Sequence, residues 1–298
     1  MRHIVILIAA LFSAATAVAQ PVLTPRHSPV PGGIAVIPLT TTSAARPTAH
    51  YQSKRVMVVG DAGHWQAIVG IPLDTSPGEQ ALEISVPSSE PQQLSFAIQA
   101  KEYESQHLTG INKRMVDPTA KDLLRIEKET KVIQAAFRHF SEADEVPLDF
   151  APPVQGPLSS PFGLRRFFNG QARKPHSGLD LAAPKGTPIK APAAGTVIAI
   201  GNFFFNGNTV LLDHGQGLIS MYSHMDRIKV TDGQHVTLGT LLGVVGMTGR
   251  VTGPHLHWTV SLNDTRVDPM LLFSDQTLAH LSAPKDLEAA HGAANGHE

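Results

Sequence analysis

Four side chains in the second half of the sequence could bind a divalent metal together. His255 and His257 are separated by one residue, and His176 and Asp180 lie four residues apart, about eighty residues earlier. A catalytic zinc site uses three nitrogen or oxygen ligands and leaves its fourth position to water. The chain has no cysteine, so a metal here would have no thiolate ligand. The pattern predicts a zinc centre that activates water for hydrolysis.

The His-x-His pair fits the start of a β-strand. Side chains alternate along a strand, so His255 and His257 would point to the same face and Leu256 to the other. Gly253 and Pro254 place the pair beside a loop. One imidazole could then bind the metal while the other stands next to the metal-bound water. Alone the pair is weak evidence, because surface strands also carry such pairs.

His176 and Asp180 can share a metal only if the chain bends between them. In a straight strand they would be about 13 Å apart, whereas two ligands of one zinc ion lie roughly 3 to 3.5 Å apart. Ser177 and Gly178 suit a bend or a bulge. Without the other histidines, His176 would read as a loop residue and Asp180 as a turn cap.

Two further histidines lie within a predicted hairpin. The apolar runs 208–213 and 221–225 surround a His-Gly-x-Gly turn at residues 214–217. His224 lies near the end of the second run, and by itself it would be a structural histidine. His214, in the turn, could either bond to backbone carbonyls or contact a substrate.

Two other segments are open to a structural or a functional interpretation. Phe203, Phe204 and Phe205 form a loop or hairpin tip, which either packs in the core or makes an aromatic lip over a groove. Arg165, Arg166, Arg173 and Lys174 lie near His176 in the sequence. They could attract the carboxylates of a peptide, or they could be ordinary solvated charges.

The rest of the chain predicts a mostly β protein in two parts. Residues 20–110 contain short strand-like runs separated by Gly-, Asp- and Pro-rich turns, as in a small β-sandwich. Residues 111–148 form a helical linker, with an amphipathic helix over 117–142 that starts at Asp117-Pro118. Prolines between 147 and 161 mark a boundary. Residues 149–275 are again β-rich and carry all the candidate chemistry, and residues 276–298 read as a flexible tail.

The first residues and the composition predict where the protein works. Residues 1–19 resemble a secretory signal peptide, with Arg2, a short apolar run and Ala17-Val18-Ala19 before a mature start at Gln20. The apolar run is too short to span a bilayer. Lys and Arg total 24 and Asp and Glu 25, so no basic surface suggests nucleic acid. We expect export across an inner membrane to a periplasm, without stable membrane insertion.

Beyond these single features, residues 149–273 resemble the lysostaphin-type (LytM-type) zinc metallopeptidases of bacterial peptidoglycan. The similarity rests on several stretches that occur in the family's order. They are Ser160-Pro-Phe-Gly-Leu-Arg165, His176-Ser-Gly-Leu-Asp180, Gly186-Thr-Pro-Ile189, Ala194-Gly-Thr-Val197, Gly207-Asn-Thr-Val210, His214-Gly-Gln-Gly217, Tyr222-Ser-His224, Gly243-Val-Val-Gly246 with Gly249, and His255-Leu-His257. Residues 21–110 resemble, more loosely, an accessory β domain found in some exported members.

The resemblance implies roles for five residues. His176, Asp180 and His257 would bind one zinc ion per chain, and His224 and His255 would be the catalytic histidines. The implied fold is an antiparallel β domain with a groove over the metal. All five positions are filled, whereas some relatives that lack ligands act only as scaffolds or as activators of amidases.

The resulting hypothesis is an exported zinc endopeptidase that hydrolyses peptide bonds in peptidoglycan stem peptides or cross-links. Zinc-activated water would be assisted by the two histidines. The first alternative is a non-catalytic regulator or activator of cell-wall amidases, and the second is a metallopeptidase that acts on proteins. The partners expected are peptidoglycan peptides, and cell-wall protein partners cannot be named from the sequence.

Overall fold

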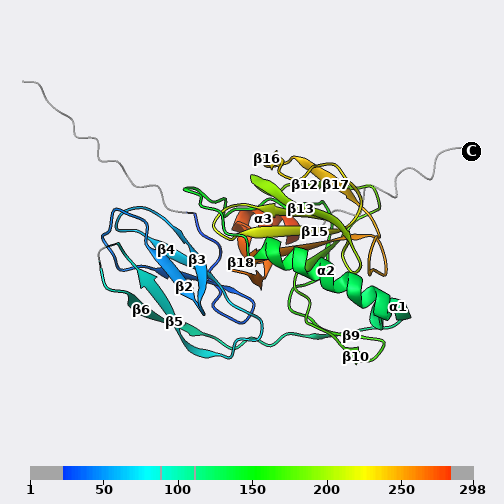
Figure 1. Cartoon of the computed structure of the whole chain (residues 1–298), viewed down its shortest axis with the longest axis horizontal. Helices are drawn as coiled ribbons and strands as arrows, with labels where there is room; N and C mark the ends of the chain where they lie inside the picture. Colours follow the sequence, from blue (N-terminus) through cyan, green and yellow to red (C-terminus); the bar gives the residue numbers. More distant parts are fainter. Residues whose placement is uncertain (1–22, 88, 111, 283–298) are drawn as a thin grey trace, which may run out of the picture.

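The protein is mostly β, in two β units joined by one long helix (Figure 1). The computed structural model describes residues 23–87, 89–110 and 112–282. The predicted signal peptide and the end of the predicted tail lie outside these residues. No helix in the described part is long and apolar enough to cross a membrane.

The N-terminal unit is one antiparallel sheet of six strands that folds over its own core. Its strand order is β1-β4-β3-β2-β5-β6. Tyr51, Val58 and Leu82 come from different strands and share one buried cluster, so this face of the sheet closes on itself much as a small sandwich would. The strands are β1 (Ile34–Pro38), β2 (Thr48–Tyr51), β3 (Lys54–Val59), β4 (Gln66–Gly70), β5 (Gly78–Ser85) and β6 (Gln92–Ile98).

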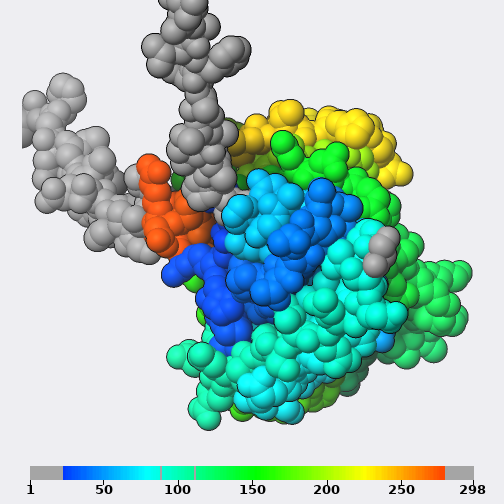
Figure 2. Space-filling view, turned by 90° about the vertical axis from the view of Figure 1, so that its left-hand side faces the viewer, coloured from blue at the N-terminus to red at the C-terminus, as the bar shows by residue number. Residues whose placement is uncertain are grey.

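The opposite face of β1, β3 and β4 packs on the C-terminal unit. Ile34, Met57 and Ile68 belong to the same buried cluster as the core of that unit. Asn263 accepts a hydrogen bond from the Gly70 N–H (2.8 Å) and donates one to its carbonyl (3.1 Å). The two units are therefore in close contact, and the N-terminal unit lies directly against its neighbour (Figure 2).

The linker is a strand followed by two helices, and its main helix starts later than expected. After β7 (Ser105–Leu108) come α1 (Lys113–Val116) and α2 (Ala120–Phe137), not one helix over 117–142. Asp117 ends α1, and Thr119 begins α2 because its side chain accepts a hydrogen bond from the Asp122 N–H in a capping box. The capping residue is therefore Thr119, two residues after the predicted Asp117, and the helix ends at Phe137, five residues before the predicted end.

Only the C-terminal half of α2 is packed as the apolar pattern predicted. Ala136 and Phe137 are buried against β13 to β15, whereas Leu123 remains 55% exposed. The helix crosses the C-terminal unit at a slant, and its first half extends toward β9 and β10 (Figure 1).

The C-terminal unit is a ten-stranded sheet, with main order β16-β13-β14-β15-β18-β11-β8. All its pairings are antiparallel, and β14, β15 and β18 are buried along most of their length. The strands are β8 (Leu158–Ser160), β11 (Leu179–Ala182), β12 (Pro188–Lys190), β13 (Gly195–Phe203), β14 (Gly207–Asp213), β15 (Ile219–Ile228), β16 (His235–Val236), β17 (Leu241–Val245), β18 (His255–Leu262) and β19 (Thr265–Val267).

A separate three-stranded sheet ties the linker to the C-terminal unit. β9 (Arg165–Phe168) pairs with β10 (Gln171–Ala172) and, in parallel, with β7. The sequence placed β7 in the N-terminal unit, and nothing local could reveal a partner some sixty residues away.

The chain continues as regular structure beyond the C-terminal sheet. A 3-10 turn, η1 (Pro269–Leu272), is followed by α3 (Asp275–Ser282). The flexible tail expected from residue 276 therefore begins as a helix. Residues 283–298 lie outside the described part.

Candidate metal centre

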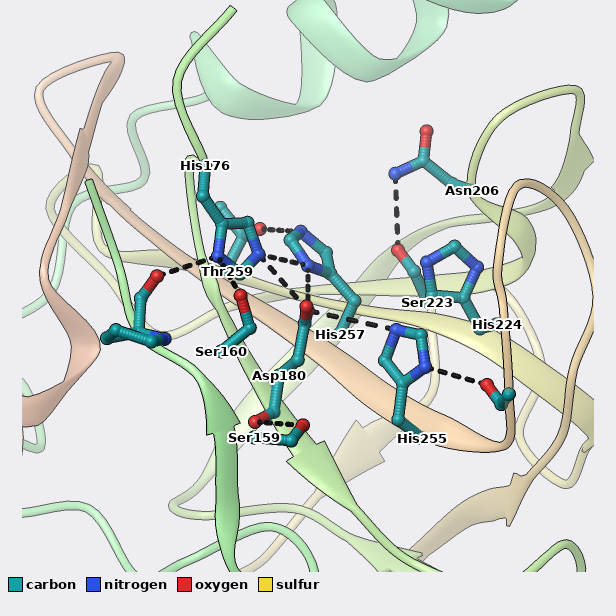
Figure 3. A network of polar contacts seen from close by, with 12 residues as sticks. Ser159, Ser160, His176, Asp180, Asn206, Ser223, His224, His255, His257 and Thr259 are labelled. Atoms are coloured by element: carbon teal, nitrogen blue, oxygen red, sulfur yellow. Dashed lines mark hydrogen bonds and ion pairs between the residues drawn. The ribbon is translucent and has the colours of Figure 1, made fainter. Parts of the chain in front are cut away.

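Two neighbouring strands and the loop before one of them bring three of the predicted ligands together. β11 and β18 are antiparallel neighbours, and Asp180 lies opposite His257 in their register. His176 precedes β11, and its ring turns back toward the other two side chains (Figure 3). The His176 Nε2 to Asp180 Oδ1 distance is 3.1 Å, and the His257 Nδ1 lies 3.0 Å from the first atom and 2.7 Å from the second.

The close approach depends on the bend expected at Gly178. A Cβ atom added there would lie 2.5 Å from the Trp258 carbonyl oxygen and 2.7 Å from the Thr259 hydroxyl. Such contacts are too short for any side chain, so only glycine lets the loop approach β18 this closely.

The hydrogen bonds around the two histidines settle the proton position on His176 and are compatible with the matching one on His257. The His176 Nδ1 lies 2.8 Å from the Pro161 carbonyl, which can only accept, so this nitrogen carries the proton. The His257 Nε2 lies 3.0 Å from the Thr259 hydroxyl, which can accept its proton. The opposite nitrogens, His176 Nε2 and His257 Nδ1, are then free to offer lone pairs.

Three lone-pair donors therefore converge on one point. His176 Nε2, His257 Nδ1 and Asp180 Oδ1 lie within 4.8 Å of one another, and all three residues are buried. Bare lone pairs at about 3 Å repel, and a shared cation removes this repulsion. Two imidazoles and a carboxylate at this spacing fit a tetrahedral zinc ion, whose bonds are about 2 Å long.

The carboxylate is also held from its other side. Arg166 Nη2 donates to Asp180 Oδ2 (2.9 Å) and to the Ser160 hydroxyl (3.0 Å). Burial alone would raise the pKa of the Asp180 carboxyl, but its polar contacts with the neighbouring His176 and His257 rings hold that pKa below its usual range. The group is therefore an anion at neutral pH, as a metal ligand must be.

Two more histidines lie beside the three donors. The ring of His224 is 4.9 Å from that of His255 and 5.9 Å from that of His257, centre to centre. Each donates from Nδ1 to a carbonyl, His224 to Thr248 (2.8 Å) and His255 to Gly253 (2.9 Å). The Nε2 of each remains able to accept a proton.

His224 has an unusual backbone as well as an unusual environment. Its φ angle is +64°, which non-glycine residues rarely adopt, and it lies where β15 shifts register against its neighbours. Burial, reinforced by the nearby His257 and His255, lowers the pKa of His224 to about 3. The imidazole is neutral at physiological pH. Strained backbone at a histidine in a cavity suggests a functional position.

All five residues line one open cavity of about 500 Å³. Its walls also include residues that the sequence did not suggest, among them Leu108 of β7, Ile126 and Thr130 of α2, and Arg250. Arg250 carries no recognisable local motif, and the contribution of the linker arises from tertiary packing alone. The only feature of the sequence that could have indicated Arg250 as a cavity residue is its position five residues before His255.

The remaining candidates divide between core and cavity. Phe203 and Phe204 are buried, while Phe205 lines the cavity. His214 lies in the core, where Nδ1 bonds to the Ala194 carbonyl (2.6 Å) and Nε2 to the Ser220 hydroxyl (2.7 Å), so the carbonyl-binding interpretation is confirmed. Arg166, Arg173 and Lys174 line the cavity and Arg165 does not.

The fold and these donors define a β protein with three histidine and aspartate side chains in a cavity that could hold a metal ion. The profile of peptidase family M23 matches residues 174–269, and that of the peptidase family M23 N-terminal domain matches residues 27–101. The crystal structure of a candidate peptidase M23 from Pseudomonas aeruginosa is 48% identical, with a TM-score of 0.70, and the match covers 83% of this chain and 95% of that one. The chain therefore belongs to peptidase family M23, and the lysostaphin-type resemblance is confirmed.

Two curated relatives match about two fifths of the chain. The DD-carboxypeptidase/endopeptidase Mpg of Neisseria meningitidis is 39% identical over 119 residues, which are 40% of this chain and 27% of that protein. The peptidoglycan DD-endopeptidase ShyA of Vibrio cholerae is 40% identical over 114 residues, 38% of this chain and 26% of that protein. The matched region spans about a quarter of the length of these relatives.

Proposed function

We propose that this protein is an exported zinc metalloendopeptidase that hydrolyses peptide bonds in peptidoglycan. The observation that carries the proposal is the convergence of three buried potential ligand atoms from His176, Asp180 and His257. Family membership supports peptidase activity, and the names of the relatives support a DD bond of peptidoglycan as the target. The basic and apolar pattern of residues 1–19 supports export to a periplasm.

In this proposal one zinc ion binds to the three donors. When bound, zinc lowers the pKa of a coordinated water to about 7 and polarises a carbonyl group. Arg166 and Thr259 hold Asp180 and His257 in their binding orientations. Such outer partners typically change metal affinity by about 10- to 100-fold when they are removed.

His224 and His255 handle protons in the same proposal. Each holds its Nδ1 proton on a carbonyl group and lines the cavity, and the Nε2 of His255 lies 3.8 Å from Asp180 Oδ1. A neutral imidazole in this state can accept a proton from the attacking water, and once protonated it can donate to the tetrahedral oxyanion or to the leaving amine. The chain has no His-Glu-x-x-His motif, so these imidazoles replace the glutamate base found there.

We also propose a division of labour along the chain. Residues 20–110 would form an accessory unit, residues 111–148 a linker, and residues 149–275 the catalytic unit. The accessory role is supported by the packing of β1, β3 and β4 on the C-terminal core.

The test is digestion of purified sacculi by the purified protein, with and without a zinc chelator, followed by mass spectrometry of the soluble products. We expect chelator-sensitive release of muropeptides cleaved at a D-alanyl bond, and none from His257→Ala. A folded protein with one bound zinc that releases nothing would contradict the proposal and favour a non-catalytic activator of amidases. Cleavage of an ordinary protein with sacculi untouched would favour a protein-directed metallopeptidase.

A further inference from the structure

Three guanidinium groups line the same cavity as the metal centre, and two of them have no short ion pair with a carboxylate. Arg166 is engaged with Asp180, as described above. Arg173 and Arg250 line the cavity without touching any of the three metal-binding side chains. Their partners are mainly carbonyl groups and aromatic rings, and the one carboxylate near them is that of Asp117, 3.8 Å from Arg173, so their positive charge is only partly balanced.

The guanidinium group of Arg250 contacts aromatic rings more than polar groups. Its guanidinium lies over the ring of Phe205 (4.4 Å) and that of Phe168 (4.9 Å). Within the described part of the chain its side chain has one hydrogen bond, a long one of 3.4 Å to the Met115 carbonyl. Burial and then the charges of Arg166 and Arg173 lower the pKa of Arg250 to about 10, so it remains charged at a cost. The rings hold the group in place with donors to spare.

Arg173 is likewise incompletely paired. Its Nη2 donates to the Val116 carbonyl (3.0 Å) and to Gln171, and Asp117, about half exposed, lies 3.8 Å away. The Nε of Arg173 is buried and has no hydrogen-bond partner, and the same is true of the Nε of Arg166. Arg173 therefore has few polar contacts in the fold, and its only ion pair is the long one with Asp117.

Both cations are attached to the loops that carry site histidines. Arg173 precedes His176 by three residues, and Arg250 precedes His255 by five. Whatever binds between them is thereby placed next to the reacting bond. The occupant must be an anion, and the cavity must also admit the peptide being cleaved.

We propose that Arg173 and Arg250 bind the free carboxylate on the residue that supplies the leaving amine. This rests on the proposed function. In a D-alanyl cross-link to diaminopimelate, the carbon that bears the scissile nitrogen also bears a carboxylate. A terminal D-alanyl-D-alanine has the same arrangement, whereas a bridge of glycines has no free carboxylate there. Planar guanidinium groups match the two oxygens of a carboxylate.

The test uses three synthetic peptides and the full-length zinc-loaded protein. The first has D-alanine joined to a diamino acid with its carboxylate free, and the second is identical except that this carboxylate is a carboxamide. The third ends in D-alanyl-D-alanine. The readout is the ratio of kcat/KM for the free acid to that for the amide, because damage to folding or metal binding lowers both values equally.

We expect wild type to prefer the free acid by on the order of 10- to 100-fold, as for a hydrogen bond to a charged group. Arg173→Gln and Arg250→Gln should each bring the ratio toward one, and Arg250→Lys should retain part of it. Arg227→Gln is the matched control, because Arg227 is 72% exposed and lies outside the cavity. It should leave the ratio unchanged.

The outcomes separate the subsite from the function. Equal cleavage of acid and amide by wild type, or a ratio that survives both glutamine variants, would overturn the subsite while leaving the peptidase intact. No cleavage of any peptide or of sacculi by wild type would overturn the proposed function, and the subsite with it. If cleavage of the first peptide depends on the arginines, the carboxylate belongs to a cross-link. If cleavage of the third peptide depends on them, the carboxylate belongs to a terminal D-alanine.

Discussion

The two β units differ in what they bury. Among the described residues, every buried charged, amide, hydroxyl or imidazole side chain apart from tyrosine lies after residue 121, and none lies in the six-stranded N-terminal sheet. The core of that sheet is apolar throughout. The C-terminal unit instead buries His176, Asp180, His214, His224 and His257. Burying a polar group lowers the stability of the fold unless the group is hydrogen-bonded or paired. A buried polar group without such a partner therefore indicates a functional role.

The contrast within the C-terminal unit is sharper. His214 and His224 are both buried, and burial lowers both pKa values, to about 4 and about 3. His214 has protein partners on both nitrogens, whereas His224 has one only on Nδ1 within the described chain. Burial and a shifted pKa therefore do not distinguish a structural histidine from a functional one. The two histidines differ instead in whether the second ring nitrogen has a hydrogen-bond partner in the described chain.

The largest effect should come from removing one of the three converging donors. We expect His257→Ala to lose stoichiometric zinc and all measurable turnover, because two donors remain where three are needed. Metal content measured on the purified, folded variant checks this. Full zinc occupancy in the variant would remove His257 from the ligand set.

Loss of a proton-handling histidine should leave the metal in place. His255→Ala is expected to retain one zinc ion and to lose about 10²- to 10⁴-fold in kcat, as is typical when a general acid or base is deleted. Metal analysis of one preparation tests the retention of zinc, and sacculus digestion by the same preparation tests the loss of turnover. An active variant would contradict the role proposed for His255.

The N-terminal core should affect stability rather than chemistry. Leu82 is completely buried there, and Leu82→Ala should cost about 2 to 5 kcal/mol in free energy of unfolding. Denaturant titration measures this. Zinc content and kcat of the folded variant should equal those of wild type, and a fall in kcat would show that the apolar unit takes part in catalysis.

His214 should make the metal-free protein less stable in acid. Its pKa is near 6.5 in the unfolded chain and about 4 in the fold. Between these values only the unfolded state binds the proton, so stability is complete above pH 6.5 and declines as pH falls to 4. The loss is roughly 3 kcal/mol.

The matched variant for this prediction is His214→Gln, which can still donate to the Ala194 carbonyl but does not titrate. Both proteins are unfolded by denaturant in chelator between pH 7.5 and 4. We expect a lower stability but a shallower pH slope for the variant. Identical slopes would show that His214 does not carry the effect.

The sequence was most informative about the candidate site where strand alternation and residue spacing determine which side chains lie together. Alternation along β18 placed His255 and His257 on one face, and the spacing of His176 and Asp180 required the bend that Gly178 makes possible. The roles of these residues came from resemblance to a family, since no spacing alone distinguishes a ligand from its neighbour.

The features that the sequence did not predict arise from contacts between distant segments. Thr119 outcompetes Asp117 as the cap of α2 because Asp122 completes its capping box. The approach of Arg250 to the cavity depends on Phe168 and Phe205, which lie 82 and 45 residues before it. Neither aromatic partner could be assigned from a local pattern.

The parallel pairing of β7 with β9 has a practical consequence for protein engineering. β9 carries Arg166, which holds Asp180, and its outer partner β7 ends forty residues before the boundary at 149 that the sequence suggests. A catalytic fragment excised at that boundary would leave one edge of β9 without its hydrogen-bonding strand. A fragment that keeps this pairing must therefore begin upstream of Ser105.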